Sequence, residues 1–320
     1  MPIRHLAGIK SLLDQVVKPD SPIPSSLPAR KREPSRAARA AFWVFAREDY
    51  VTAYLERAHT YLDTEDVLMW RFFGLRIADA KTVSCAVPPS WPAKVHTLVK
   101  EDDFSNLLIW IICRIVNFLS TGGQNNTSQS QQTSTSNLIG PEKIDEEGHR
   151  KHRAKRLELC VALDSWINAI PVTFTPCARI DNPQASYMGA QLPTMPFPEL
   201  YFSIPACAAS VQFYHFARIL LLLDELQDNS HDQSSTSNRL RHYRDVSRKI
   251  NSHCREICAI AVGRPQGSVR IHMPQPLFLA GQCLEDLEER KCVVELLREI
   301  ERDTGWATEY RAKQLQAECQ

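Results

Sequence analysis

The hydrophobic positions of this chain recur at helical spacing in several long segments. Apolar side chains three or four residues apart form a stripe, and charged side chains fill the opposite face. One helix face comprises Phe42, Phe45, Ala46, Asp49 and Ala53, and a later stripe comprises Leu159, Leu163, Trp166, Ile167 and Ile170, ended by Pro171. Segment 107–119 is apolar nearly all round, which is typical of a buried central helix. With no convincing alternation of strand type, we predict an all-α protein of packed antiparallel helix pairs in one large domain, residues 1–320.

The segment from Pro274 to Trp306 carries the clearest pattern. It predicts one long amphipathic helix that begins at a proline and ends at Asp303-Thr304-Gly305. Its apolar stripe consists of Leu277, Ala280, Leu284, Leu287, Val294, Leu297 and Ile300. On the other face, Asp286 with Arg290 and Glu288 with Lys291 are spaced as ion pairs on a helix surface.

Polar insertions interrupt the helical pattern. Residues 120–137 are almost entirely Ser, Thr, Gln, Asn and Gly, and residues 228–238 are similar. Such segments bury too little apolar surface to offset the entropy of ordering, so we predict disordered insertions at about 120–140 and 228–238. The proline-punctuated segment 171–198 is expected to be irregular but packed on the core, because it carries Phe174, Tyr187, Met188 and Phe197.

Composition narrows the class of protein. Hydrophobic residues make up 43% of the chain, enough for a sizeable core, and the net charge of +1 argues against a strongly basic nucleic-acid binder. The residues after Met1 do not form a secretory signal, and the scattered cysteines indicate reduced, mostly buried thiols. The most apolar segment, 107–119, is too short to span a bilayer and contains Arg114. We expect a soluble intracellular protein that does not associate with membranes.

Two basic runs are candidates for nuclear import signals or phosphate-contacting patches. The first consists of Arg30, Lys31 and Arg32, and the second of Arg150, Lys151, Arg153, Lys155 and Arg156. The alternative for each run is a solvated linker or helix end.

A polar group lies within the otherwise apolar segment 206–223. Tyr214, His215 and Arg218 could line an effector pocket, or they could form a satisfied polar cluster between helices. Cys254 and Cys258 are one helical turn apart, but zinc needs three or four ligands, which favours core packing. Five tryptophans are predicted to be core anchors: Trp43, Trp70, Trp110, Trp166 and Trp306.

Catalytic motifs are not evident in the sequence. A phosphate-binding glycine loop, a nucleophile elbow and a dinucleotide fingerprint are all missing from it. The acidic run from Asp224 to Asp228 resembles the magnesium-binding motif of terpene cyclases, but it lies late in the chain and lacks the second motif downstream. An all-α, magnesium-dependent enzyme is therefore a remote alternative, and we predict no enzyme, catalytic residue, bound metal or cofactor.

Five segments, in this order, resemble the fungal-specific transcription factor domain, which normally lies C-terminal to a zinc binuclear cluster. They are residues 4–13, with the Arg4-His5-Leu6-Ala7-Gly8 motif; residues 40–50, with Arg47-Glu48-Asp49-Tyr50; residues 213–221, with Tyr214-His215-Phe216-Ala217-Arg218; residues 257–262; and residues 274–306. The resemblance covers nearly the whole chain. It implies a transcriptional regulator in the nucleus that responds to a small-molecule effector or to other transcription regulators.

The chain departs from that family at one point. A zinc cluster needs six cysteines within about thirty residues, whereas Cys85 is the first cysteine of this sequence. Because of this departure we expect no zinc and no autonomous DNA binding, so a DNA-binding partner is expected. Either the chain is a stand-alone relative or its sequence starts late, with the domain incomplete at its N-terminus. The alternative function is a stand-alone helical interaction scaffold with no transcriptional role.

Overall fold

The computed structural model describes residues 33–76, 101–128, 141–181, 195–228 and 235–318, together with Gly8 and Ser11. Most of these residues lie in α-helices, which confirms the predicted all-α class. Contacts between Cα atoms divide the chain into two compact units, residues 1–169 and 170–320. The sequence did not predict this division.

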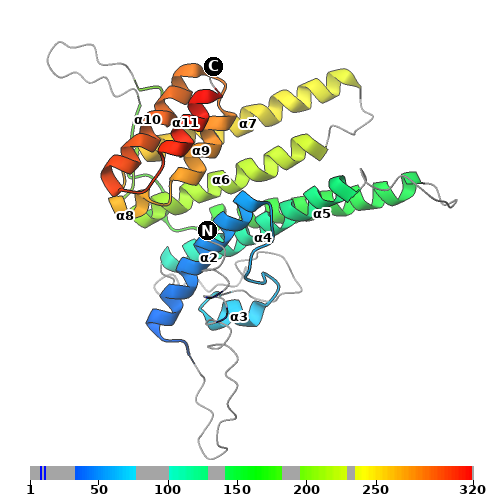
Figure 1. Ribbon diagram of the computed structural model, residues 1–320, viewed down its shortest axis with the longest axis horizontal. Coiled ribbons are helices and arrows are strands. Elements are labelled where there is room, and N and C mark those ends of the chain that lie inside the picture. The colour runs from blue at the N-terminus through cyan, green and yellow to red at the C-terminus, as the bar shows by residue number, and fades with distance from the viewer. Residues whose placement is uncertain are drawn as a thin grey trace, which may run out of the picture. The chain divides into compact units, whose positions relative to one another are not determined.

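Unit 1 is built from long helices around α4. Its described helices are α2 (Arg36–Glu56), α3 (Val67–Phe72), α4 (Glu101–Ser128) and α5 (Pro141–Ala169) (Figure 1). Helix α4 packs against both α2 and α5, and every residue from Leu108 to Val116 is buried, as predicted for a central helix. Helix α2 begins where the Ser35 hydroxyl accepts a hydrogen bond from the backbone of Ala38, and α5 ends two residues before Pro171.

Aromatic side chains form much of the core of unit 1. Phe42 stacks on Phe73 with 4.1 Å between ring centroids and meets Trp70 edge to face at 5.1 Å. Each buried indole N–H donates to a backbone carbonyl, with Trp43 bonded to Phe73, Trp70 to Asp63, Trp110 to Thr64 and Trp166 to Phe104. These four tryptophans are core anchors, as predicted. In unit 2, Trp306 is 49% exposed, because it lies in the loop after α10 and not on a helix face.

Two polar side chains hold the connection between α2 and α3. The Asp49 carboxylate on α2 is fully buried and accepts hydrogen bonds from the backbone N–H groups of Tyr61 and Leu62, each at 2.8 Å. Asn117 on α4 accepts from the backbone of Thr60 at 2.8 Å and donates to its hydroxyl at 3.0 Å. Since buried backbone donors need partners, these contacts fix the path of the loop. The two hydrogen bonds of Asp49 also explain why an acidic residue lies on the buried face of α2.

Unit 2 combines a short sheet with further helices. Its described elements are η1 (Val172–Phe174), β1 (Ala178–Ile180), β2 (Glu199–Tyr201), α6 (Pro205–Asp228), α7 (Thr236–Val262), α8 (Gly267–Arg270), α9 (Pro274–Cys283), α10 (Leu287–Thr304) and α11 (Glu309–Ala317). The strands pair antiparallel, with Ala178 opposite Tyr201. Three residues are too few to show alternation, so the strands were not predicted. Phe174 and Phe197 are buried as expected, whereas Tyr187 and Met188 lie outside the described residues.

Helix α7 contacts α6, α9 and β2. Its last turn, Ile257–Val262, is buried at every position. Gly263 follows directly, and a Cβ atom there would lie 1.9 Å from the carbonyl oxygen of Leu200 on β2. Only glycine therefore allows β2 to cross so closely over the end of α7.

The closing segment forms two helices, so the prediction of one long helix was wrong. Helix α9 ends at Cys283, and the Asp286 carboxylate caps α10 by accepting a hydrogen bond from the backbone of Glu289 at 2.9 Å. The break turns Leu287 away from the predicted stripe, and its side chain is 48% exposed. The predicted stop is correct, because α10 ends at Gly305 in a left-handed conformation with φ 71°.

Of the two ion pairs predicted in the closing segment, one forms, whereas the arginine of the other bonds to a backbone carbonyl instead. The Lys291 ammonium lies 2.8 Å from the Glu288 carboxylate, which confirms that ion pair. Arg290, expected to pair with Asp286, donates from Nε to the backbone carbonyl of Leu284. The guanidinium thereby satisfies a carbonyl where the chain leaves α9.

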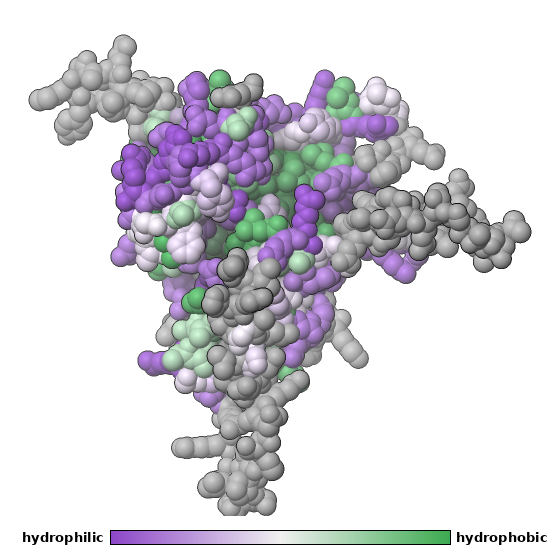
Figure 2. Space-filling view, viewed as in Figure 1, coloured by the Kyte–Doolittle hydropathy of each residue, from purple (hydrophilic) through white to green (hydrophobic). Residues whose placement is uncertain are grey.

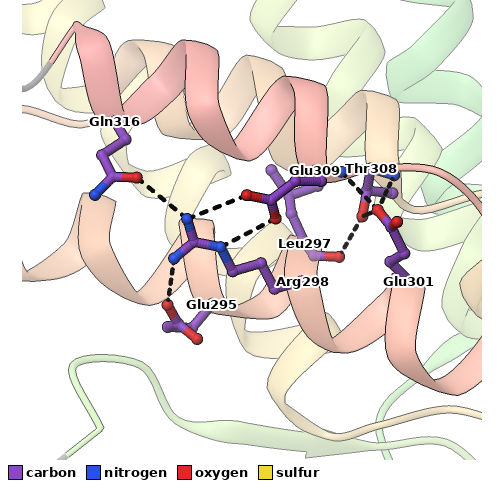
Figure 3. A network of polar contacts seen from close by, with 7 residues as sticks. All are labelled: Glu295, Leu297, Arg298, Glu301, Thr308, Glu309 and Gln316. Carbon is purple, nitrogen blue, oxygen red and sulfur yellow. Dashed lines mark hydrogen bonds and ion pairs between the residues drawn. The ribbon is translucent and has the colours of Figure 1, made fainter.

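A polar network joins α10 to α11 (Figure 3). The Arg298 guanidinium donates to side-chain oxygens of Glu295, Glu309 and Gln316, at 2.8, 3.1 and 3.1 Å. The Glu301 carboxylate accepts from the backbone N–H groups of Thr308 and Glu309, both at 2.6 Å, and these bonds lower the pKa of that carboxyl. The view in Figure 2 shows mainly hydrophilic side chains over these two helices. The network thus caps α11 and sets its direction.

The helices extend into both predicted insertions. Helix α4 continues to Ser128, and α7 begins at Thr236, so residues 120–128 and 236–238 are helical. Residues 129–140 and 229–234 lie outside the described residues. Two segments, Glu101–Thr121 of α4 and the whole of α6, are long and apolar enough to cross a membrane. Most of their residues are buried, which is also typical of core helices.

Candidate functional site

The three predicted site residues Tyr214, His215 and Arg218 lie on α6, where they face a histidine of α7. The imidazoles of His215 and His253 are joined by a hydrogen bond of 2.8 Å between their Nδ1 atoms. The Tyr214 ring lies edge-on to both imidazoles, with its centroid 5.3 Å from that of His215 and 6.3 Å from that of His253. Packing of α6 against α7 thus brings together residues 38 positions apart in sequence.

Burial and charge keep this pair neutral. Desolvation, followed by the neighbouring His253 and the Arg218 guanidinium, lowers the pKa of His215 to about 3. Desolvation and the same arginine lower the pKa of His253 to about 4. Both side chains are therefore neutral imidazoles at physiological pH, half-buried between the helices.

A neutral pair of this kind has a defined hydrogen-bonding pattern. One Nδ1 carries the shared proton and the other accepts it, so the two remaining Nε2 atoms differ in role. The imidazole that donates from Nδ1 keeps an acceptor at Nε2, and its partner keeps an Nε2–H donor. We call Tyr214, His215, Arg218 and His253 the α6–α7 polar cluster.

Sequence reasoning found three of the four members and missed His253. The signal was present, because His253 is a polar side chain in the apolar C-terminal half of a helix expected to pack on its neighbour. What periodicity did not supply was the register between α6 and α7.

The second basic run lies on α5, where three of its members pair with carboxylates of the same helix. Arg150 and Lys151 lie 2.5 and 3.5 Å from the carboxylate of Glu147, and Lys155 lies 3.0 Å from that of Glu158. The last member, Arg156, is buried. Arg150, Lys151 and Arg153 are exposed to solvent and Lys155 is partly exposed, so a partner could reach these four on the folded helix. The first run, residues 30–32, lies outside the described residues.

The cysteine pair of the weak zinc candidate belongs to the packing of helices. Cys254 and Cys258 are fully buried in α7, which fits the core role that we favoured. Among the residues that the structure describes, no three His, Cys, Asp or Glu side chains lie where they could share a metal ion. In the acidic run at the end of α6, the Glu225 carboxylate lies 3.4 Å from Nε2 of His242 on α7, and Asp228 is buried.

Sequence comparison gives one informative relative. The chain is 32% identical over 322 residues to the transcription activator AMTR1 of Alternaria alternata, and the match covers 98% of this chain. The same match covers 40% of the relative, so this chain spans less than half of that protein's length. No family model matches the chain, and no solved structure matches it. The chain is thus similar, almost throughout, to part of a fungal transcription activator.

Proposed function

We propose that this chain is a transcriptional regulator acting in the nucleus and corresponds to the regulatory region of a fungal transcription factor. The observation that carries the proposal is the 32% identity to a fungal transcription activator over 98% of the chain. Independent support comes from the order of the five sequence motifs, since a shared order is harder to meet by chance than any one motif. Two of these motifs have clear roles in the fold, because Asp49 caps a buried loop and His215 pairs with His253.

The regulatory signal is a small polar effector or a protein partner that changes the packing of α6 on α7. The α6–α7 polar cluster supports this mechanism because it places a neutral, hydrogen-bonded histidine pair between two otherwise apolar helix faces. A ligand that binds one arrangement of these helices better than another shifts the population toward it. These 320 residues contain no six-cysteine cluster, so in this proposal they do not contact DNA by themselves.

The test is a reporter assay in a fungal cell. The full chain is fused to a heterologous DNA-binding domain that does not activate transcription by itself. Reporter output is expected to differ severalfold from that of the DNA-binding domain alone, and the fusion is expected to accumulate in the nucleus. The interaction scaffold is favoured instead if the unfused chain lies in the cytosol and if deleting its gene leaves the transcriptome unchanged.

Matched variants locate the effect in the polar cluster. His253→Gln removes the imidazole that pairs with His215, whereas His242→Gln removes one from the same helix outside the cluster. Reporter output should change with the first variant and stay at the wild-type level with the second. Equal effects of the two variants at equal protein abundance would refute a role for the cluster. Sequence-selective, salt-resistant DNA binding by the purified chain would refute the claim that this chain does not bind DNA by itself.

A further inference from the structure

Helix α5 carries a second apolar stripe, on the side opposite the one that packs on α4. Its buried side, which includes Leu159 and Leu163, contacts α4. On the outer side, Leu157 is 65% exposed, Val161 is 46% exposed, and Ala154 is exposed as well. The outer face of a surface helix is ordinarily polar, so a helix with apolar residues on two opposite sides has a second surface to cover.

The exposed residues of this outer side keep a regular spacing along the helix. Successive members stand four, three, four, three and four residues apart, so they lie within about 40° of one line that runs along about five turns. This is the spacing of the seam along which two helices pair side by side. Apolar side chains occupy the middle of the line, a cation one end, and an acid and an amide the other. We call this line the outer stripe of α5; its members are Arg150, Ala154, Leu157, Val161, Asp164 and Asn168.

The charges at its two ends fit a second copy of the same helix that runs in the opposite direction. A two-fold axis between Leu157 and Val161 sets each of them opposite the other residue in the second copy. The same axis places Asp164 of the second copy beside Arg153 and within one turn of Arg150, and symmetry repeats this charge cluster. Parallel helices would instead bring Arg150 to Arg150 and Asp164 to Asp164. Like charges therefore oppose the parallel arrangement, and unlike charges favour the antiparallel one.

The ion pair that Arg150 already makes does not prevent this contact. Its guanidinium lies 2.5 Å from the Glu147 carboxylate on the same helix, and its side chain is 77% exposed. An exposed pair of this kind contributes little to stability, and a guanidinium has enough N–H donors for two carboxylates.

We propose that the outer stripe of α5 is a homodimer interface, in which two copies of the chain pair their α5 helices antiparallel with Leu157 against Val161 at the centre. One helix face buries less surface than a standard protein–protein interface, so the dissociation constant is expected in the micromolar range. This dimer goes beyond the proposed transcriptional function and does not depend on it.

The test is sedimentation equilibrium of the purified full chain, over concentrations that reach the high micromolar range. A monomer–dimer equilibrium is expected. Leu157→Glu should raise its dissociation constant at least about tenfold, because each dimer loses two buried leucines and gains two buried charges. Leu68→Glu is the matched control: Leu68 is 78% exposed on α3 of the same unit, outside the stripe, and its replacement should leave the constant unchanged. A chain that is monomeric at every concentration, or equal constants for wild type and Leu157→Glu, would overturn the proposal.

Exchange of the end charges tests the direction of pairing. Asp164→Arg gathers three cations in each cluster of the antiparallel dimer and should weaken association at least about threefold, and the double variant Arg150→Glu, Arg153→Glu should do the same with three acids. An equimolar mixture of the two proteins should restore association to the wild-type level, because each cation of the mixed dimer again faces an acid. In a parallel dimer, Asp164→Arg only replaces one pair of like charges by another. Unchanged association of this variant would therefore refute the antiparallel interface.

Discussion

Replacing Asp49 by Asn is expected to destabilise the fold by about 2–4 kcal/mol. The carboxylate accepts two backbone hydrogen bonds of 2.8 Å, from Tyr61 and Leu62, in a site without exposure to solvent. An amide offers one oxygen acceptor and turns an NH₂ donor toward the other backbone N–H, which is left unpaired. That unpaired donor costs about 1–3 kcal/mol, and the remaining bond loses about 1 kcal/mol with the charge.

The chain provides a matched control on the same helix. Glu48→Gln makes the same chemical change one residue earlier, at an exposed position, and should alter stability by less than about 0.5 kcal/mol. Urea unfolding followed by tryptophan fluorescence gives the free energy of unfolding. Hydrogen exchange of the amides of Tyr61 and Leu62 reports the site itself, and about 2–4 kcal/mol corresponds to exchange about 30- to 1,000-fold faster. If Asp49→Asn matches Glu48→Gln in both measurements, the buried carboxylate does not hold this loop.

Three further predictions concern unit 2. Gly263→Ala should cost about 3 kcal/mol in thermal unfolding, because its Cβ would lie 1.9 Å from a carbonyl of β2, whereas Gly267→Ala, with open space around it, should cost under about 1 kcal/mol. His215 and His253 have pKa values of about 3 and 4 in the folded protein, below the value of 6.5 in the unfolded chain. Their contribution to the free energy of unfolding is therefore fully present above pH 6.5 and is lost as the pH falls towards 4. At pH 5 the loss should be about 2 kcal/mol for each histidine, and His253→Gln should flatten the dependence of urea unfolding on pH. Thr308→Val removes a buried donor to a carbonyl of α10 and should lower the free energy of unfolding by about 1–2 kcal/mol.

Periodicity predicted the helices that bury one continuous face and failed where two helices share a stripe. Leu284 and Leu287 fit one long helix as well as they fit two, so their spacing could not reveal the break. A local signal was available in Asp286 and Glu289, since an acid followed three residues later by Glu is typical of a helix start. We interpreted Asp286 as part of a surface ion pair, whereas its carboxylate caps α10.

The candidate site was predictable on one helix only. The residues of α6 stood out because polar side chains are rare in so apolar a segment. Their partner on α7 depends on the register between the two helices, which the packing of many side chains decides together. Helix periodicity fixes the face on which a residue lies, but it does not fix which residue of the neighbouring helix lies opposite.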